Sequence, residues 1–282
     1  MYHLIFLIIL AGIWLVFASI YDLKKRMVPN WLSFSLIIFA LGFRFFYSLF
    51  ESESYLFFYQ GLIGLGIFFI VGNALYYGRM FAGGDAKLMM ALGVILPFSM
   101  DLLKNLELFF LFVILFLFAG GFYGLIWSVF LTLNNFKIFK KEFTNQFNNK
   151  KNKEIVYAVM AFALVIMVYG LFETLFFYLG ILIFIMPYFY IYARSIDNSC
   201  LIKSTFVSKL EEGDWLYEDL KIGRNTIKSK WRGLTKEEIK IIKKNHKKIM
   251  IRQGIPFVPA FLISFLAFVY FYFQNISLFS FL

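Results

Sequence analysis

The sequence is poor in the residues that build disulfides and metal sites. Cys200 is its only cysteine, which excludes an intramolecular disulfide and a cysteine-rich zinc module. The two histidines, His3 and His246, have no neighbouring cluster of ligand residues, so we expect them to lie on the surface and to bind no metal.

Charged residues are also scarce. They make up 16% of the chain, against 61% hydrophobic residues, whereas about a quarter of a soluble domain is charged. The sequence therefore predicts an all-α, polytopic membrane protein. The formal net charge of +11 would suggest nucleic-acid binding in a soluble protein. Here we assign it to cytoplasmic loops that contact anionic lipid, and we expect no nucleic-acid partner.

Several stretches approach the roughly 20 apolar residues that a helix needs to cross the hydrocarbon core. We predict about eight (six to eight) transmembrane helices, of which the fourth is short and ends at Pro97. The eight stretches are residues 2–20, 31–50, 56–77, 86–98, 108–131, 156–172, 174–193 and 255–273.

Basic residues are distributed unevenly between the two sets of loops. Four loops on one side carry 26 of the 28 lysines and arginines, at residues 22–30, 78–87, 132–155 and 194–254. By the positive-inside rule these loops are cytoplasmic, and both termini lie outside the cell membrane. Arg44 falls within a predicted span, and we expect its side chain to extend outward to the membrane surface.

This threading divides the chain into five parts. They are a membrane core with both candidate aspartates (1–131), a polar basic loop (132–155), a transmembrane hairpin (156–193), a small cytoplasmic domain (194–254) and a C-terminal transmembrane helix (255–282). In the small domain, Thr235 and Glu238 form a capping box that starts a helix. That helix places apolar residues on one face, at Ile239, Ile242, Ile249 and Met250. It either lies along lipid headgroups or packs on its own domain.

The topology leaves two acidic residues at the membrane ends of predicted spans. Asp22 ends the first span and Asp85 opens the fourth, both on the cytoplasmic side, and the remaining acids lie in loops or in the small domain. Two close carboxylates can share a proton, so that one activates water while the other polarises a carbonyl. Each has a simpler alternative. Asp22 could pair with Lys24 or Arg26, and Asp85 could cap its helix.

The residues around both aspartates favour a catalytic role over these simpler alternatives. Gly83 and Gly84 precede Asp85 and permit positive φ and a close backbone approach. Pro29-Asn30 follows the basic residues after Asp22. These segments resemble the type IV prepilin peptidases, membrane aspartic proteases with a Gly-x-Gly-Asp-x-Lys-Leu motif. The resemblance implies that Asp22 and Asp85 are catalytic and that the second motif is completed by Gly83, Gly84 and Lys87. The first motif glycine is Ala82 here.

The resemblance also carries expectations about substrates. Without Cys-x-x-Cys pairs, and with a C-terminal stretch at 234–260 like theirs, the chain is most similar to archaeal prepilin and preflagellin peptidases. The resemblance implies that the substrate is a pilin or archaellin precursor. Such a precursor has a basic leader and a hydrophobic helix and is cut at the cytoplasmic membrane face. The resemblance implies no metal or organic cofactor. It leaves open the choice of precursor and the oligomeric state.

Two other functions remain possible from the sequence. Tyr21-Asp22 with Gly84-Asp85 also resembles presenilin and signal peptide peptidase, although Pro259-Ala260-Phe261 departs from the Pro-Ala-Leu element of that family. A transporter could use the two carboxylates as a proton relay, which would favour internal repeats and helices broken near the midplane. Neither feature is evident in the sequence.

Overall fold

The structure is a computed structural model that describes residues 2–50, 55–222 and 225–276. The chain forms two compact units, Met1–Leu125 with Ile255–Leu282, and Ile126–Gly254. Each is described by itself below.

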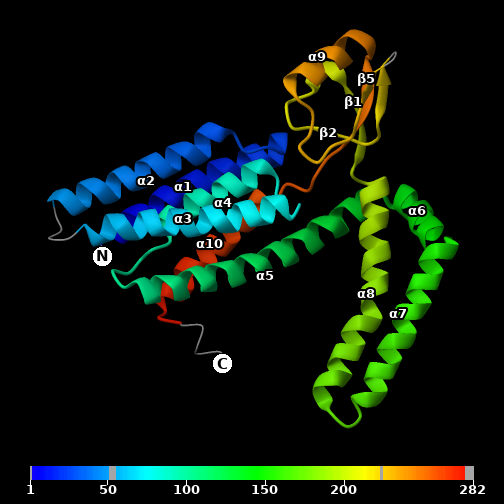
Figure 1. The fold of residues 1–282 in the computed structure, drawn as a ribbon, viewed down its shortest axis with the longest axis horizontal. Helices are drawn as coiled ribbons and strands as arrows, with labels where there is room; N and C mark the ends of the chain where they lie inside the picture. The colour runs from blue at the N-terminus through cyan, green and yellow to red at the C-terminus, as the bar shows by residue number, and fades with distance from the viewer. Residues whose placement is uncertain (1, 51–54, 223–224, 277–282) are drawn as a thin grey trace. The chain divides into compact units, whose positions relative to one another are not determined.

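The first unit is a bundle of membrane helices. Figure 1 shows its elements, which are α1 (Tyr2–Lys25), α2 (Asn30–Phe50), α3 (Leu56–Tyr77), α4 (Gly83–Ile95), the first part of α5 (Leu102–Asn134) and α10 (Val258–Phe273). Although α10 comes from the far end of the chain, it packs beside α1. Apolar side chains with almost no exposed surface fill the bundle, including Leu7, Leu36 and Phe265.

Helix α4 lies in the centre of this bundle. Leu88, Met89 and Leu92 have no exposed surface. Its neighbour α3 approaches so closely that a Cβ on Gly64 would collide with the carbonyl oxygen of Gly93. Small residues allow such close packing between membrane helices. Because protein encloses α4, its 13 residues need not satisfy the length required of a lipid-facing span.

Six helices in the described residues are long and apolar enough to cross a membrane, namely α1, α2, α3, α5, α7 and α8. The predicted spans at 86–98 and 255–273 correspond to the shorter helices α4 and α10. This confirms the expected polytopic helical fold.

The second unit begins with the end of α5 and continues through α6 (Phe136–Asn148), α7 (Lys150–Tyr169) and α8 (Thr174–Ser199). Residues 132–155 are therefore largely helical, and the expectation of a polar loop was wrong. Phe139, Phe143 and Phe147 recur every four residues and give α6 an apolar stripe. Phe139 is buried, with its ring centroid 5.6 Å from that of Tyr192 on α8.

The rest of the second unit is a small domain, residues 202–252. It contains β1 (Ile202–Phe206), the 3-10 helix η1 (Val207–Lys209), β2 (Trp215–Leu216), β3 (Leu220–Ile222), β4 (Asn225–Ile227), α9 (Lys236–Asn245) and β5 (Lys248–Arg252). An antiparallel sheet has the order β1-β5-β2, with Ile202 opposite Arg252, while β3 pairs with β4. Every strand in the described residues belongs to this domain.

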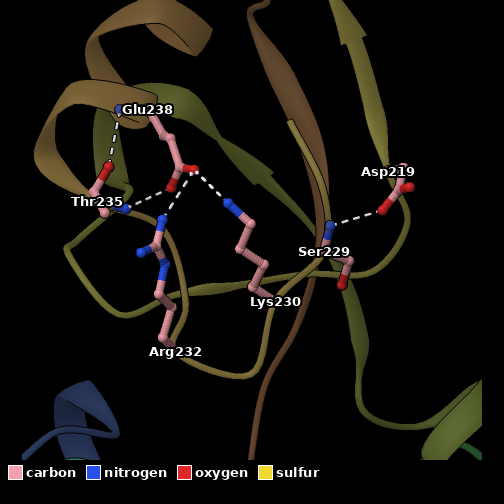
Figure 2. Close-up of polar contacts among 6 residues, drawn as sticks. All are labelled: Asp219, Ser229, Lys230, Arg232, Thr235 and Glu238. Atoms are coloured by element: carbon pink, nitrogen blue, oxygen red, sulfur yellow. Dashed lines mark hydrogen bonds and ion pairs between the residues drawn. The ribbon is translucent and has the colours of Figure 1, made fainter. Parts of the chain in front are cut away.

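The capping box that starts α9 is confirmed. Thr235 Oγ1 accepts a hydrogen bond from the Glu238 backbone at 3.3 Å, and Glu238 Oε2 accepts one from the Thr235 backbone at 2.9 Å (Figure 2). The helix is shorter than expected, however, and ends at Asn245. Ile249 and Met250 lie on β5, where burial alternates with a period of two.

The apolar face of α9 packs on its own domain. Ile239 and Ile242 are buried in a core shared with Val207, Leu216 and Ile251. Of the two alternatives for this helix, the structure therefore supports packing within the domain.

The expectation for Arg44 was wrong. Its side chain has no exposed surface and does not extend to the membrane surface. The guanidinium instead donates hydrogen bonds to four backbone carbonyls inside the bundle. Three of them lie at or just after the carboxyl end of α4, where helix carbonyls lack partners within the helix.

Candidate active site

Asp22 lies in the last turn of α1 and is buried, with 5% of its surface exposed. Its Oδ2 accepts a hydrogen bond of 2.8 Å from the backbone N–H of Val258. Val258 is the first residue of α10. The free N–H groups and the partial positive charge of a helix start both favour a carboxylate there. The first and last helices of the bundle, α1 and α10, are therefore in contact at Asp22.

Arg26 completes the end of α1. Its backbone N–H donates to the Asp22 carbonyl at 2.7 Å, and its φ of 56° is the left-handed conformation that often terminates helices. The Arg26 guanidinium also interacts electrostatically with the Asp22 carboxylate. The alternative role for Asp22, as a partner of Arg26, is thus compatible with the geometry and does not exclude a chemical one.

Asp85 is the third residue of α4 and is partly exposed. Its Oδ2 accepts a hydrogen bond of 3.2 Å from the backbone N–H of Ala82, so it does help to cap its helix. Its carboxylate also interacts electrostatically with that of Asp22. The two acids selected from the sequence, 63 positions apart, are therefore brought together at the adjoining ends of α1 and α4.

The two glycines before Asp85 differ in their surroundings. A Cβ on Gly84 would lie 3.1 Å from the Val28 Cβ, in the loop after α1, whereas one on Gly83 would make an ordinary contact of 3.8 Å with Tyr76. Neither glycine has positive φ, so that part of the expectation was wrong. Gly84 instead permits the close approach of the two motif segments. Ala82 has φ −73° and ψ 161°, an extended conformation that any residue adopts, which explains why alanine is tolerated there.

Lys87 joins the second motif to the first. Its Nζ donates a hydrogen bond of 2.7 Å to Asn30 Oδ1, at the start of α2. The Pro29-Asn30 pair and the Gly-Gly-Asp segment are thus parts of one site.

Sequence reasoning missed several groups around Asp22. The backbone N–H groups of Phe257 and Val258 donate to its carboxylate, and Tyr123 interacts electrostatically with it. Arg26 was not missed: it lies one helical turn after Asp22 and was named from the sequence as a possible partner. The contact with Val258 had no signal in the sequence, since it joins the Asp22 side chain to a backbone N–H 236 positions away.

Comparisons with known proteins show similarity to leader peptidases in the part of the chain that carries both aspartates. Residues 9–129 match the model of the type IV leader peptidase family. The N-terminal part of this chain is similar to that family over this stretch. A preflagellin peptidase from Methanocaldococcus jannaschii is 36% identical over 89 residues, which cover 32% of this chain and 37% of that protein. The prepilin peptidase EppA from Methanothermobacter thermautotrophicus is 35% identical over 88 residues, covering 31% of this chain and 23% of that protein. No solved structure matches the chain.

The segment matched by the family model contains Asp22, Asp85, Gly83, Gly84 and Lys87. It does not contain Phe257 or Val258, so the donors to Asp22 come from outside the matched region. The stretches matched to the two relatives span only 37% and 23% of the length of those proteins.

No group of three His, Cys, Asp or Glu side chains in the described part of the chain is placed to hold a metal ion. The independence from metal and cofactor implied by the family resemblance stays a prediction.

Proposed function

We propose that this protein is a membrane aspartic endopeptidase in which Asp22 and Asp85 form the catalytic pair. The observation that carries the proposal is the meeting of these two carboxylates at the ends of α1 and α4. Asp22 is buried and oriented by the Val258 N–H, while Asp85 is partly exposed in the first turn of α4. A substrate peptide bond would enter beside Asp85.

The chemistry requires one proton on the pair. The ionised carboxylate accepts a proton from water, and the resulting hydroxide attacks the scissile carbonyl carbon. The protonated carboxylate donates a hydrogen bond to the carbonyl oxygen and stabilises the tetrahedral intermediate. Proton transfer to the amide nitrogen then releases the amine, and the pair returns to its starting state. A pair that shares one proton can supply both roles because like charges at short distance do not ionise together.

We propose that the substrate is a pilin-like or archaellin precursor, with a short basic leader followed by a hydrophobic helix. The names of the two relatives, preflagellin peptidase and prepilin peptidase, support this class. A hydrophobic precursor helix can reach the site from the bilayer, while the partly exposed Asp85 keeps access to water. The surplus of lysine and arginine in the loops that contain both aspartates supports cleavage at the cytoplasmic face of the cell membrane.

Co-expression with candidate precursors tests the proposal. Membranes from cells that contain the peptidase and one precursor, either a pilin or an archaellin, are analysed by a gel shift and by sequencing of the new N-terminus. We expect loss of the leader with the wild-type chain and none with Asp22→Asn. Cleavage by a well-folded Asp22→Asn variant at a near-normal rate would show that the protease mechanism is wrong. Proton-coupled transport would then be the next function to measure.

A further inference from the structure

Helix α2 holds both ends of α4, the helix that carries Asp85. At the start of α2, Asn30 accepts the hydrogen bond from Lys87. Fourteen residues later, Arg44 donates to three carbonyls at the other end of α4, those of Val94, Ile95 and Pro97. The two helices therefore run parallel and are joined at two points.

The contacts of Arg44 satisfy a specific need of α4. The last carbonyls of a helix have no partner within it, and in a membrane protein no bulk water replaces that partner. Arg44 Nε lies 2.8 Å from Val94 O, and Nη2 lies 3.2 Å from Ile95 O and 2.7 Å from Pro97 O. The remaining nitrogen, Nη1, donates to Phe57 O at 2.9 Å. The positive charge also lies at the negative end of the helix dipole.

The surroundings of Arg44 are shaped to admit a guanidinium. Its carbon Cζ lies 4.2 Å from the centroid of the Phe57 ring, a cation–π contact. Gly61 leaves room for the side chain, because a Cβ there would lie 2.6 Å from Arg44 Cδ. A charge buried at membrane depth is costly, so an arginine with no exposed surface and four carbonyl partners indicates a specific role.

A displacement at one end of α4 is transmitted to the other. Asp85 and Ile95 are ten residues apart, about 15 Å along a helix, and hydrogen bonds make that length stiff. The loop after α4 is also held, because Asn105 binds the backbone of Ser99 at both its N–H and its carbonyl. The position of Asp85 along the helix axis therefore depends on the contacts at the carboxyl end.

We propose that Arg44 is a positioning residue, which together with Asn30 fixes α4 along its axis and so places Asp85 against Asp22. The consequence for catalysis rests on the function proposed above. The structural consequence, a defined position of residue 85, does not.

Kinetics of the full-length protein in detergent test the catalytic consequence. Arg44→Met keeps an unbranched side chain that reaches as far as Nε but removes all four donated hydrogen bonds. Misplacement of a catalytic group by about 1 Å can lower the rate about 10²-fold. We expect kcat to fall by about that factor with little change in KM, with partial recovery in Arg44→Lys and a smaller loss in Asn30→Ala. Lys104→Met, the loss of an exposed cation on α5, is the matched control and should retain wild-type kcat.

A second measurement does not require activity. In a Cys200→Ser background, the Asp85→Cys thiol is labelled with a charged maleimide, and the labelling rate is compared with and without the Arg44 change. We expect at least a severalfold change in rate on Arg44→Met and none on Lys104→Met. A wild-type chain that cleaves no precursor would refute the proposed function but leave this labelling difference intact.

The positioning role is overturned if folded Arg44→Met retains both the wild-type kcat and the wild-type labelling rate. Should Arg44→Met fail to fold, as judged by gel filtration, Arg44→Lys and Asn30→Ala decide the question by the same two readouts, and unchanged values in both would overturn it.

Discussion

The backbone N–H of Val258 donates a 2.8 Å hydrogen bond to Asp22 Oδ2, across 236 positions of the sequence. The carboxylate at the end of α1 thus occupies the amino end of α10, where helix N–H groups lack partners of their own. This contact fixes the orientation of Asp22 in a site whose second acid comes from α4.

Asp22 and Asp85 should act as a unit. Asn substitution keeps the size of the side chain but removes its ability to exchange a proton. We expect Asp22→Asn and Asp85→Asn each to reduce cleavage at least 10³-fold, and the double variant to lose little more, because groups that act together are strongly non-additive. The measurement is kcat/KM on a purified precursor. Glu173→Gln and Asp101→Asn, at exposed positions, should cleave normally. Multiplicative losses in the double variant would contradict a shared proton.

Glu should not replace either aspartate. The additional methylene moves the carboxylate by more than the roughly 0.5 Å that a catalytic site tolerates. In Asp22→Glu it also displaces the group from the Val258 N–H. We expect cleavage to fall at least 10²-fold in detergent while the gel-filtration profile is unchanged. Near-normal cleavage by Asp22→Glu would show that this site does not need the observed geometry.

Gly84 and Gly83 form a matched pair for a steric test. A Cβ on Gly84 would lie 3.1 Å from Val28, so Gly84→Ala should push the loop after α1 away from α4. Overpacking of this kind costs about 1–3 kcal/mol. We expect kcat/KM to fall at least tenfold. Gly83→Ala, one residue earlier on the same helix, has space and should remain within about twofold of wild type. Equal losses in the two variants would refute the steric role of Gly84.

The lysines around the end of α9 should attract anionic lipid. Lys243 and Lys244 end the helix, and Lys247 and Lys248 follow it. Each lysine near an anionic surface contributes about 1 kcal/mol at most, so changing all four to Gln should weaken vesicle binding by up to about 10³-fold. Cosedimentation with phosphatidylserine vesicles measures this. High salt should weaken wild-type binding in the same way. Cleavage in detergent should be retained, and its complete loss in a folded variant would contradict a lipid role.

The stability of α9 should depend on pH through Glu238. The backbone hydrogen bond from Thr235 lowers the pKa of this carboxyl below its usual value of 4.5, and Lys230 and Arg232 act in the same direction. A lowered pKa in the folded state stabilises the fold above about pH 4.5 and loses that contribution as the pH falls through the lowered value. Figure 2 shows these partners around Glu238.

Hydrogen exchange of the α9 amides, corrected for intrinsic rates, checks this dependence. From pH 7 to pH 3.5 the protection of α9 should fall in wild type but much less in Glu238→Gln, which keeps the hydrogen bonds of the capping box without the charge. Glu237→Gln, at an exposed neighbouring position, should behave as wild type. Thr235→Ala should lower protection at every pH, by about 1 kcal/mol. An equal pH dependence in wild type and Glu238→Gln would refute the assignment.

Local sequence patterns were sufficient for much of the fold. Helices α2 and α3 begin and end within a residue of the predicted spans, because continuous apolar runs bounded by polar residues define a membrane helix. The pair of candidate acids could also be selected from the sequence, since the predicted topology assigned every other carboxylate to a loop or to the small domain.

The errors share a cause. Residues 132–155 are polar on average, but three phenylalanines at helical spacing give α6 a partner in α8. The spacing of Ile249 and Met250 also fits the apolar face of a longer α9. Pairing with β1 places them in a strand instead. In each case a tertiary partner outside the segment decided its conformation.

The sequence by itself determined that this chain is a helical membrane protein, which acids are candidates for chemistry, and which residues form the motif around Asp85. Those properties follow from apolar length, charge distribution and short-range spacing. Only the tertiary structure decided that Val258 donates to Asp22, that Gly84 admits Val28 and that Arg44 closes the carboxyl end of α4. These contacts join segments that are distant in the sequence. Where one partner is a backbone N–H or carbonyl, the identity of the residue that provides it does not reveal the contact.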